Sequence, residues 1–216
     1  MKRMIYRGQV KEGFEEAAQK IMKRRKNAHC MVREGYIMTI SAFYWNRNIF
    51  LYYECVQNVI EPHDIFHDVE AYMEDWPGDA KKRKWIPMID VFHFNVPADC
   101  EHWLRKKPVE RREGRVAQLK PEKISSYIYY HYQVQGEKTF LGGKYDMIAM
   151  HENLLFGYQE YPTIIEKPVN QKKLINDDRR LDWINFRVDL HFQPWEDGHL
   201  YFKQIEQLFS YYMDCI

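Results

Sequence analysis

The chain has 216 residues, of which 45% are hydrophobic and 29% are charged, and its formal net charge is +1 at pH 7. This is the composition of an ordinary soluble globular protein that has enough apolar residues to form a core. Nucleic acids and anionic membrane surfaces favour clearly basic partners, so the balance of 32 basic against 31 acidic residues argues against both.

Other patterns restrict the location and the chemistry. No apolar stretch is long enough to span a bilayer, and the first residues lack the apolar centre of a signal peptide. The four cysteines are widely scattered and form no Cys-x-x-Cys pair, so we expect a cytoplasmic protein with neither a disulfide framework nor a bound metal. Glycine loops for phosphate and Gly-x-Ser-x-Gly motifs are absent, which leaves nucleotide-binding and serine-hydrolase functions without support.

In the first half, hydrophobic periodicity predicts the order strand, helix, strand, strand, helix, strand. The expected strands are 4–10, 36–44, 49–56 and 88–95, and the expected helices are 12–27 and 65–75. The two middle strands enclose Trp45-Asn46-Arg47-Asn48, a composition typical of a hairpin turn.

The second half predicts the same order again. The expected strands are 115–119, 145–150, 154–160 and 184–192, and the expected helices are 121–133 and 171–182. Apolar residues at helical spacing over 200–213 predict one more helix, packed back on the body of the protein.

Three short matches in the same order indicate that the two halves are copies. Trp85-Ile86 with His93-Phe94 resembles Trp183-Ile184 with His191-Phe192, at an offset of 98 residues. Residues 7–11 match 116–120 at an offset of 109, and residues 48–54 match 153–160 at an offset of 105. Insertions and deletions in loops explain the drift, so we expect a tandem duplication. The paired His93 and His191 then indicate a shared packing role.

The predicted fold class is α+β. A β-α-β-β-α-β order is the ferredoxin-like plan, and two such units are expected to form an intramolecular α/β barrel. The expected domains are residues 1–97, a charged connector at 98–114, and residues 115–216, which carry the site and the C-terminal helix. The protein would be a monomer with an internal pseudo-dimer, or a homodimer.

The helix expected at 121–133 carries the candidate chemistry. Tyr127 and His131 are four residues apart, so they lie on one face, which Ile124 and Ile128 mark as inward. A half-buried imidazole exchanges protons near neutral pH, and a tyrosine hydroxyl can orient a ligand. In the first half, Ala18 and Met22 stand in these two places. Without a ligand, the same two residues would be ordinary core residues of an amphipathic helix.

The second half resembles the L-rhamnose mutarotase family between about Val116 and Glu160. The resemblance rests on Gln-x-x-Pro ending a strand, Tyr-x-x-x-His on the next helix, and Asn-Leu-Leu-Phe in a hairpin. It implies a dimeric α/β-barrel fold, no cofactor, and a free monosaccharide such as rhamnose as the substrate. His131 would be the proton donor, and the sugar would be bound by Tyr127, Tyr145, Gln118 and Trp183, the last as a substitute for a tryptophan pair that this chain lacks.

Anomer exchange needs one acid and one base. The candidates for the group that would work with His131 are His151, Glu160 and Asp189.

Two other functions stay open. One is a non-catalytic module that binds a small molecule or a protein partner, since the first half keeps the plan without the Tyr and His pair. The other is a cofactor-free or haem-related monooxygenase, by analogy of fold.

Overall fold

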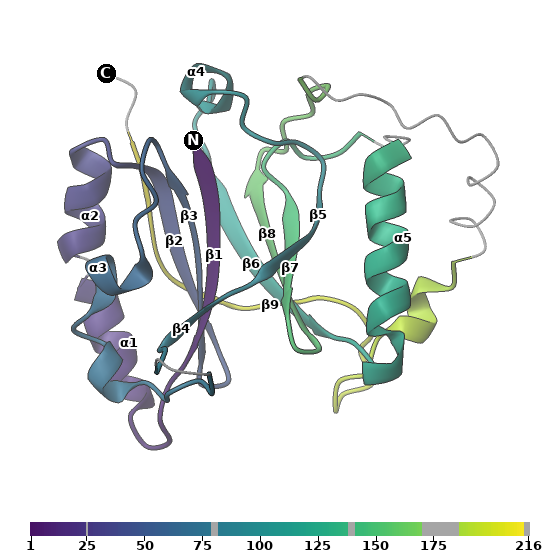
Figure 1. Cartoon of the computed structure of the whole chain (residues 1–216), viewed down its shortest axis with the longest axis horizontal. Coiled ribbons are helices and arrows are strands. Elements are labelled where there is room, and N and C mark those ends of the chain that lie inside the picture. The colour runs from purple at the N-terminus through teal and green to yellow at the C-terminus, as the bar shows by residue number, and fades with distance from the viewer. Residues whose placement is uncertain (25, 79–81, 138–140, 170–185, 214–216) are drawn as a thin grey trace. The chain divides into compact units, whose positions relative to one another are not determined.

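The computed structural model describes residues 1–24, 26–78, 82–137, 141–169 and 186–213. The chain divides into two compact units (Figure 1). The first unit holds residues 1–88, 99–106 and 205–216, and the second holds 89–98 and 107–204. The predicted boundaries treat each half as continuous, whereas each unit takes a segment from the other half.

The first unit contains an antiparallel sheet in the order β10-β2-β3-β1-β4. Its strands are β1 (Lys2–Gln9), β2 (Ile37–Trp45), β3 (Asn48–Cys55), β4 (Trp85–Pro87) and β10 (Glu206–Tyr212). Its helical segments are α1 (Glu15–Arg24), α2 (Lys26–Arg33), α3 (Pro62–Phe66), η1 (Glu70–Tyr72) and α4 (Cys100–Trp103). Figure 1 shows α1, α2 and α3 along one face of this sheet, where Ala18 and Met22 are buried in the core.

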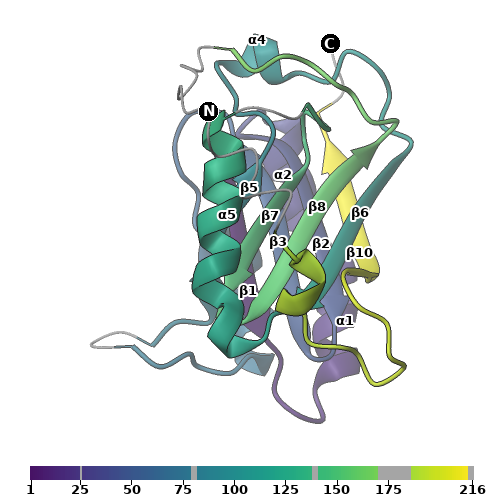
Figure 2. The same ribbon diagram turned by 90° about the vertical axis from the view of Figure 1, so that its right-hand side faces the viewer.

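The second unit contains an antiparallel sheet in the order β5-β7-β8-β6-β9. Its strands are β5 (Ile89–His93), β6 (Arg111–Gln118), β7 (Met147–His151), β8 (Leu154–Tyr161) and β9 (Lys203–Gln204). Its helical segments are η2 (Pro121–Lys123), α5 (Ile124–Glu137) and η4 (Val188–His191). Figure 2 shows α5 lying along one face of this sheet.

The order of four strands within each sheet is that of a ferredoxin-like unit, so the predicted α+β fold class is confirmed. In the first unit, β3 and β4 pair with the two edges of β1. In the second unit, β8 and β9 pair in the same way with the two edges of β6. The predicted hairpin at Asn46 and Arg47 is also confirmed, because both residues have the positive φ that a tight turn between twisted strands requires.

Backbone hydrogen bonds show that the two units repeat one arrangement, and they correct the predicted alignment of the two halves. The amide of Lys11 donates to the carbonyl of Tyr72, and the amide of Lys120 donates to the carbonyl of His191. Next to each of these hydrogen bonds lies an antiparallel β-bridge, which joins Val10 to Met73 in the first unit and Leu119 to Phe192 in the second. His191 therefore corresponds to Tyr72.

The match of His93 with His191 is therefore wrong as a structural equivalence. His93 ends strand β5, whereas His191 ends the 3-10 helix η4, so the predicted strand at 184–192 is also wrong for the described part of that range. Trp183 and the helix expected at 171–182 lie outside the described residues.

Each sheet contains a fifth strand that comes from the other half of the sequence. The chain leaves the first sheet after β4, passes Met88, and enters the second sheet as β5. It leaves the second sheet after β9, passes Ile205, and joins β2 of the first sheet as β10. The predicted helix at 200–213 is therefore wrong. Leu208 and Phe209 are both buried because a bulge between Gln207 and Phe209 interrupts the alternation of the strand, which gives apolar residues a helix-like spacing.

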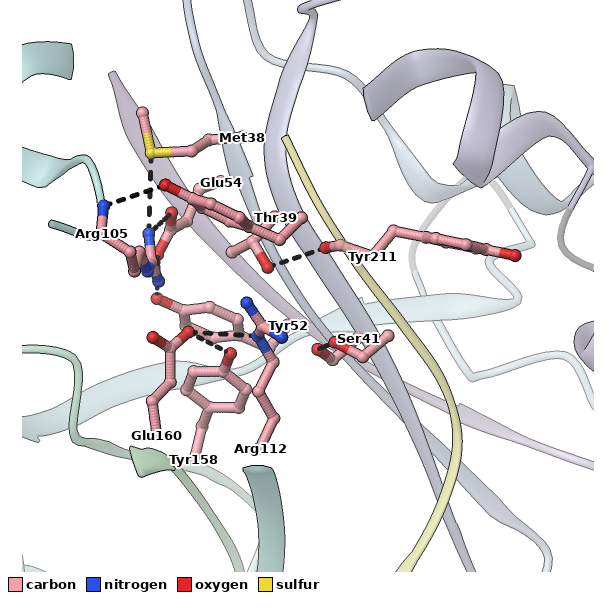
Figure 3. Close-up of polar contacts among 12 residues, drawn as sticks. Met38, Thr39, Ser41, Tyr52, Glu54, Arg105, Arg112, Tyr158, Glu160 and Tyr211 are labelled. Atoms are coloured by element: carbon pink, nitrogen blue, oxygen red, sulfur yellow. Dashed lines mark hydrogen bonds and ion pairs between the residues drawn. The ribbon is translucent and has the colours of Figure 1, made fainter. Parts of the chain in front are cut away.

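Strands β3 and β8 each carry a tyrosine and a glutamate two residues apart, and Figure 3 shows these side chains. The Tyr52 hydroxyl donates to Glu54 at 2.5 Å, and the Tyr158 hydroxyl donates to Glu160 at 2.7 Å. Within the first unit, the fully buried Glu54 also accepts from the indole of Trp103 at 2.8 Å and from both terminal nitrogens of Arg105. Within the second unit, Nε of Arg112 lies 3.4 Å from Glu160.

Candidate functional site

The second unit contains a pocket of about 430 Å³ on the side of the sheet that α5 covers. Six of the nine residues that line it are apolar, and the other three are Arg115, His131 and Asp146. The apolar lining residues are Phe92, Phe94, Val134, Leu141, Met147 and Ile148. Ligand pockets commonly combine such apolar walls with a few convergent polar groups, so this pocket is the candidate site.

Five segments of the unit supply the walls. Arg115 lies on the inner strand β6, while His131 and Val134 share a face of α5. Phe92 lies on β5, with Phe94 just beyond its end, and the two rings meet edge to face with centroids 4.8 Å apart. Met147 and Ile148 begin β7, and Asp146 immediately precedes it.

Two glycines hold the main chain close to these side chains. A Cβ atom on Gly142 would lie 2.3 Å from the ring of Phe94, and one on Gly143 would lie 2.4 Å from the carboxyl group of Asp146. Neither position has room for a larger residue without movement of the pocket wall. The amide of Asp146 also donates to the carbonyl of Gly143 at 3.0 Å, which fixes the turn before β7.

Asp146 is the lining residue whose pKa lies closest to neutral. Burial raises the pKa of its carboxyl group to about 6, and the nearby carboxylate of Glu160 adds to the rise. The guanidinium of Arg115 and the backbone amide of Glu160 act in the opposite direction. A carboxyl group with this pKa can both accept and donate a proton near neutral pH.

His131 lies in the same pocket as a neutral base. Burial lowers its pKa to about 4, although its hydrogen bond to the carbonyl of Tyr127 partly offsets that effect. That bond joins Nδ1 to the carbonyl oxygen at 2.8 Å. A carbonyl can only accept, so Nδ1 carries the proton and Nε2 carries the lone pair of the neutral ring. The ring packs on Tyr127, with centroids 3.9 Å apart, and edge-on against Phe92.

Arg115 brings a positive charge to the pocket. Its guanidinium carbon lies 5.3 Å from the centre of the Phe202 ring, and its Nε is buried with no hydrogen-bond partner among the described residues. Arg115 lowers the pKa of Tyr127 against the larger effect of burial, and it lowers that of Asp146, so its charge reaches both residues.

Comparisons with known proteins leave the family open. No protein-family model matches the chain, and no curated protein matches it in sequence. Among solved structures, the chain is similar to a protein provisionally named a monooxygenase from Fusobacterium nucleatum subsp. nucleatum, with 10% identity over 97% of this chain and 93% of that one, and a TM-score of 0.40. A protein of the same provisional name from Lactobacillus acidophilus has 9% identity over 100% of this chain and 99% of that one, with a TM-score of 0.41.

An anthrone oxidase-like protein has 7% identity over 98% of this chain and 93% of that one, and its TM-score is 0.37. At these values the similarities support no conclusion about activity. None of the three is named as a mutarotase.

The structure brings together two of the predicted site residues. Tyr127 and His131 are in contact and both are buried in α5, but only His131 lines the pocket. Gln118 ends β6, and Tyr145 is buried beside Lys144, whose Nζ lies 5.6 Å from the Tyr145 ring. Neither lines the pocket, and Trp183 is outside the described residues. The sugar-binding roles of these residues stay predictions.

The three candidates for a second acid or base do not line the pocket either. Glu160 is buried with Arg112 and Tyr158, and Asp189 forms an exposed ion pair with Arg187. Nδ1 of His151 lies 4.0 Å from Oε2 of Glu152. Within the described ranges, no three His, Cys, Asp or Glu side chains are grouped as metal ligands, and no helix is long and apolar enough to cross a membrane.

Sequence reasoning missed Arg115 and Asp146. Arg115 belongs to a strand that also carries Arg111 and Arg112, so it resembles one more surface charge. Asp146 stands beside a turn, where aspartate is common. The one available signal was Gly142-Gly143, which marks a place where the backbone passes close to other atoms.

Proposed function

We propose that the second unit binds a small, flat and largely apolar molecule in this pocket, and that Asp146 exchanges a proton with it. The observation that carries the proposal is a carboxyl group with a pKa of about 6 in an apolar pocket that also holds an arginine. Perturbed titratable groups in such pockets are typical of functional sites. The protein would then be an enzyme that uses its own side chains for acid–base catalysis.

The pocket residues would divide the work as follows. At neutral pH, Asp146 is largely ionised and His131 is neutral, so Asp146 accepts the proton. The positive charge of Arg115 stabilises the negative charge that develops on the substrate as the proton leaves. The apolar walls, with Phe92 and Phe94 at one side, exclude water and strengthen both electrostatic effects.

The reaction that follows proton removal has two forms. Return of the proton to another atom of the substrate gives an isomerisation, of which sugar mutarotation is one case. Reaction of the substrate anion with dioxygen forms a carbon–oxygen bond, and the resulting peroxide anion takes back the proton. This is an oxygenation, as the names of two of the structural neighbours suggest for those proteins. The mainly apolar lining favours an aromatic substrate over a free sugar, because a sugar requires many more hydrogen-bonding groups.

The test first measures binding and then reaction. Calorimetry with 2-naphthol would be carried out on the wild type, on Ile148→Trp, which fills the pocket, and on Ile165→Trp, whose site is 60% exposed. We expect 2-naphthol to bind to the wild type and to the surface variant but not to the filled pocket. Equal binding by all three proteins would contradict the proposal.

The reaction is followed with aromatic alcohols and ketones in D₂O by NMR, beside an oxygen electrode. Deuterium entry into carbon sites without oxygen uptake identifies an isomerase, and oxygen uptake identifies an oxygenase. Asp146→Asn is expected to lower the rate about 100-fold or more, whereas Asp189→Asn, at an exposed ion pair, leaves it unchanged. Equal rates for the two variants would rule out Asp146 as the acid–base group.

A further inference from the structure

Arg115 differs from the other two arginines of strand β6. Nη2 of Arg111 lies 3.3 Å from Glu113, and Nε of Arg112 lies 3.4 Å from Glu160. Arg115 has no ion pair with any described carboxylate, and its contact is with the ring of Phe202. This arginine also lines the pocket.

Such a charge is costly in a free protein. Nε of Arg115 is buried and makes no hydrogen bond to the described residues. A buried donor without a partner destabilises the folded protein, and more so when it belongs to a charged group. An anionic ligand oxygen in the pocket would remove this cost, because guanidinium groups bind carboxylates through two parallel hydrogen bonds.

Asp146 is the lining residue that would oppose such a ligand. It is the one carboxyl group among the residues that line the pocket, and the groups that act on it are Arg115 of β6 and Glu160 of β8. His131 of α5 is neutral near pH 7 and lines the same pocket. A second carboxylate beside Arg115 would therefore repel Asp146, and protonation of Asp146 would remove that repulsion.

We propose that the pocket selects small aromatic carboxylates, that the carboxylate binds to the guanidinium of Arg115, and that Asp146 takes up one proton as the ligand enters. This rests on the proposed function, since it concerns the same pocket and the same acid–base group. The charges balance: Arg115 keeps its positive charge, the ligand brings one negative charge, and the proton from solvent neutralises Asp146. With such a ligand bound, Asp146 is protonated and acts first as the proton donor, whereas with an uncharged substrate it stays ionised and acts first as the acceptor.

The experiment compares 1-naphthoate with 1-naphthamide, which has nearly the same shape and no charge. Calorimetry at neutral pH in two buffers of different ionisation enthalpy gives the affinity and the number of protons taken up. The proteins are the wild type, Arg115→Gln, Asp146→Asn and the control Arg111→Gln, which removes an equal charge from the same strand but not from the pocket.

We expect the wild type and the control to bind naphthoate at least about 10-fold more tightly than naphthamide, as a charge-assisted hydrogen bond implies. Arg115→Gln should lose this preference and still bind naphthamide. Naphthoate should bring close to one proton into the wild type and none into Asp146→Asn, which has no carboxyl group to protonate.

Three results would overturn the inference. Equal affinity of the wild type for both probes, or a preference that survives in Arg115→Gln, would show that Arg115 does not select an anion. Equal proton uptake by the wild type and Asp146→Asn would remove Asp146 from the coupling. In these cases binding of naphthamide would leave the proposed function standing, whereas failure of both probes to bind would contradict the proposed function as well.

Discussion

Gly143 lies directly against the carboxyl group of Asp146, so that a Cβ atom on Gly143 would come within 2.4 Å of it. This contact ties the position of the acid–base group to a residue that has no side chain. The main chain at Gly143 and the carboxylate of Asp146 pack together in the turn before β7, and a methyl group is enough to disturb this contact.

Gly143→Ala should therefore move Asp146 and distort the pocket. We expect a loss of about 1–3 kcal/mol in the free energy of unfolding, measured by urea denaturation, and weaker binding of 1-naphthoate. Gly198→Asn is the control, because no atom lies within 4 Å of the added Cβ and asparagine tolerates the positive φ of 77°. Unchanged stability and binding in Gly143→Ala would mean that the side chain of Asp146 can move aside without cost.

Asp146→Asn should change how stability depends on pH. The pKa of Asp146 is raised in the folded protein, so its contribution to stability is present below about pH 4 and is lost as the pH rises through about 6. Since Asp146 is partly exposed to solvent in the pocket, we expect Asp146→Asn to gain only about 1–2 kcal/mol over the wild type at pH 7. The difference should vanish near pH 4. A difference that is independent of pH would contradict the raised pKa.

His131→Phe should have the opposite pH dependence. The pKa of His131 is lowered in the folded protein, so its contribution is present above about pH 6.5 and is lost as the pH falls through about 4. Relative to the wild type, His131→Phe should gain about 2–3 kcal/mol between pH 6.5 and 4, measured by urea denaturation at each pH. The exposed His199, changed to Phe, serves as the control. Parallel pH profiles for His131→Phe and the wild type would disprove a buried neutral imidazole.

Glu54→Gln should strongly destabilise the first unit. Glu54 is fully buried and pairs with Arg105 through two contacts of 2.6 and 2.8 Å, so its loss leaves a buried guanidinium without its counter-charge. Removal of one partner from such a pair costs about 3–5 kcal/mol in the free energy of unfolding. The control is Glu206→Gln, which breaks a half-exposed pair with Lys23 and should cost less than about 1 kcal/mol. Similar losses in both variants, measured by thermal and urea unfolding, would contradict this account.

The sequence predicts most of the strands and the inward face of α5, because these depend on the spacing of apolar residues along the chain. Tyr127 and His131 are buried as their four-residue spacing indicates. The prediction of a helix at 200–213 is wrong because a bulged strand and a helix place apolar residues at similar intervals. Which of the two forms depends on the open edge of β2, which is far away in the sequence. Arg115 and Asp146 were missed because their environment comes from the packing of α5, β6 and the turn before β7.

The exchange of end strands has a consequence for biosynthesis. The edge of β2 is complete only when β10 pairs with it, and β10 is translated after every strand of the second unit. While the ribosome makes residues 46–205, the first unit therefore exposes a strand edge open to wrong partners. The sheet of the first unit is complete only after β10 is made, so this unit, although translated first, finishes folding late. A nascent chain stalled before residue 206 should therefore depend on chaperones.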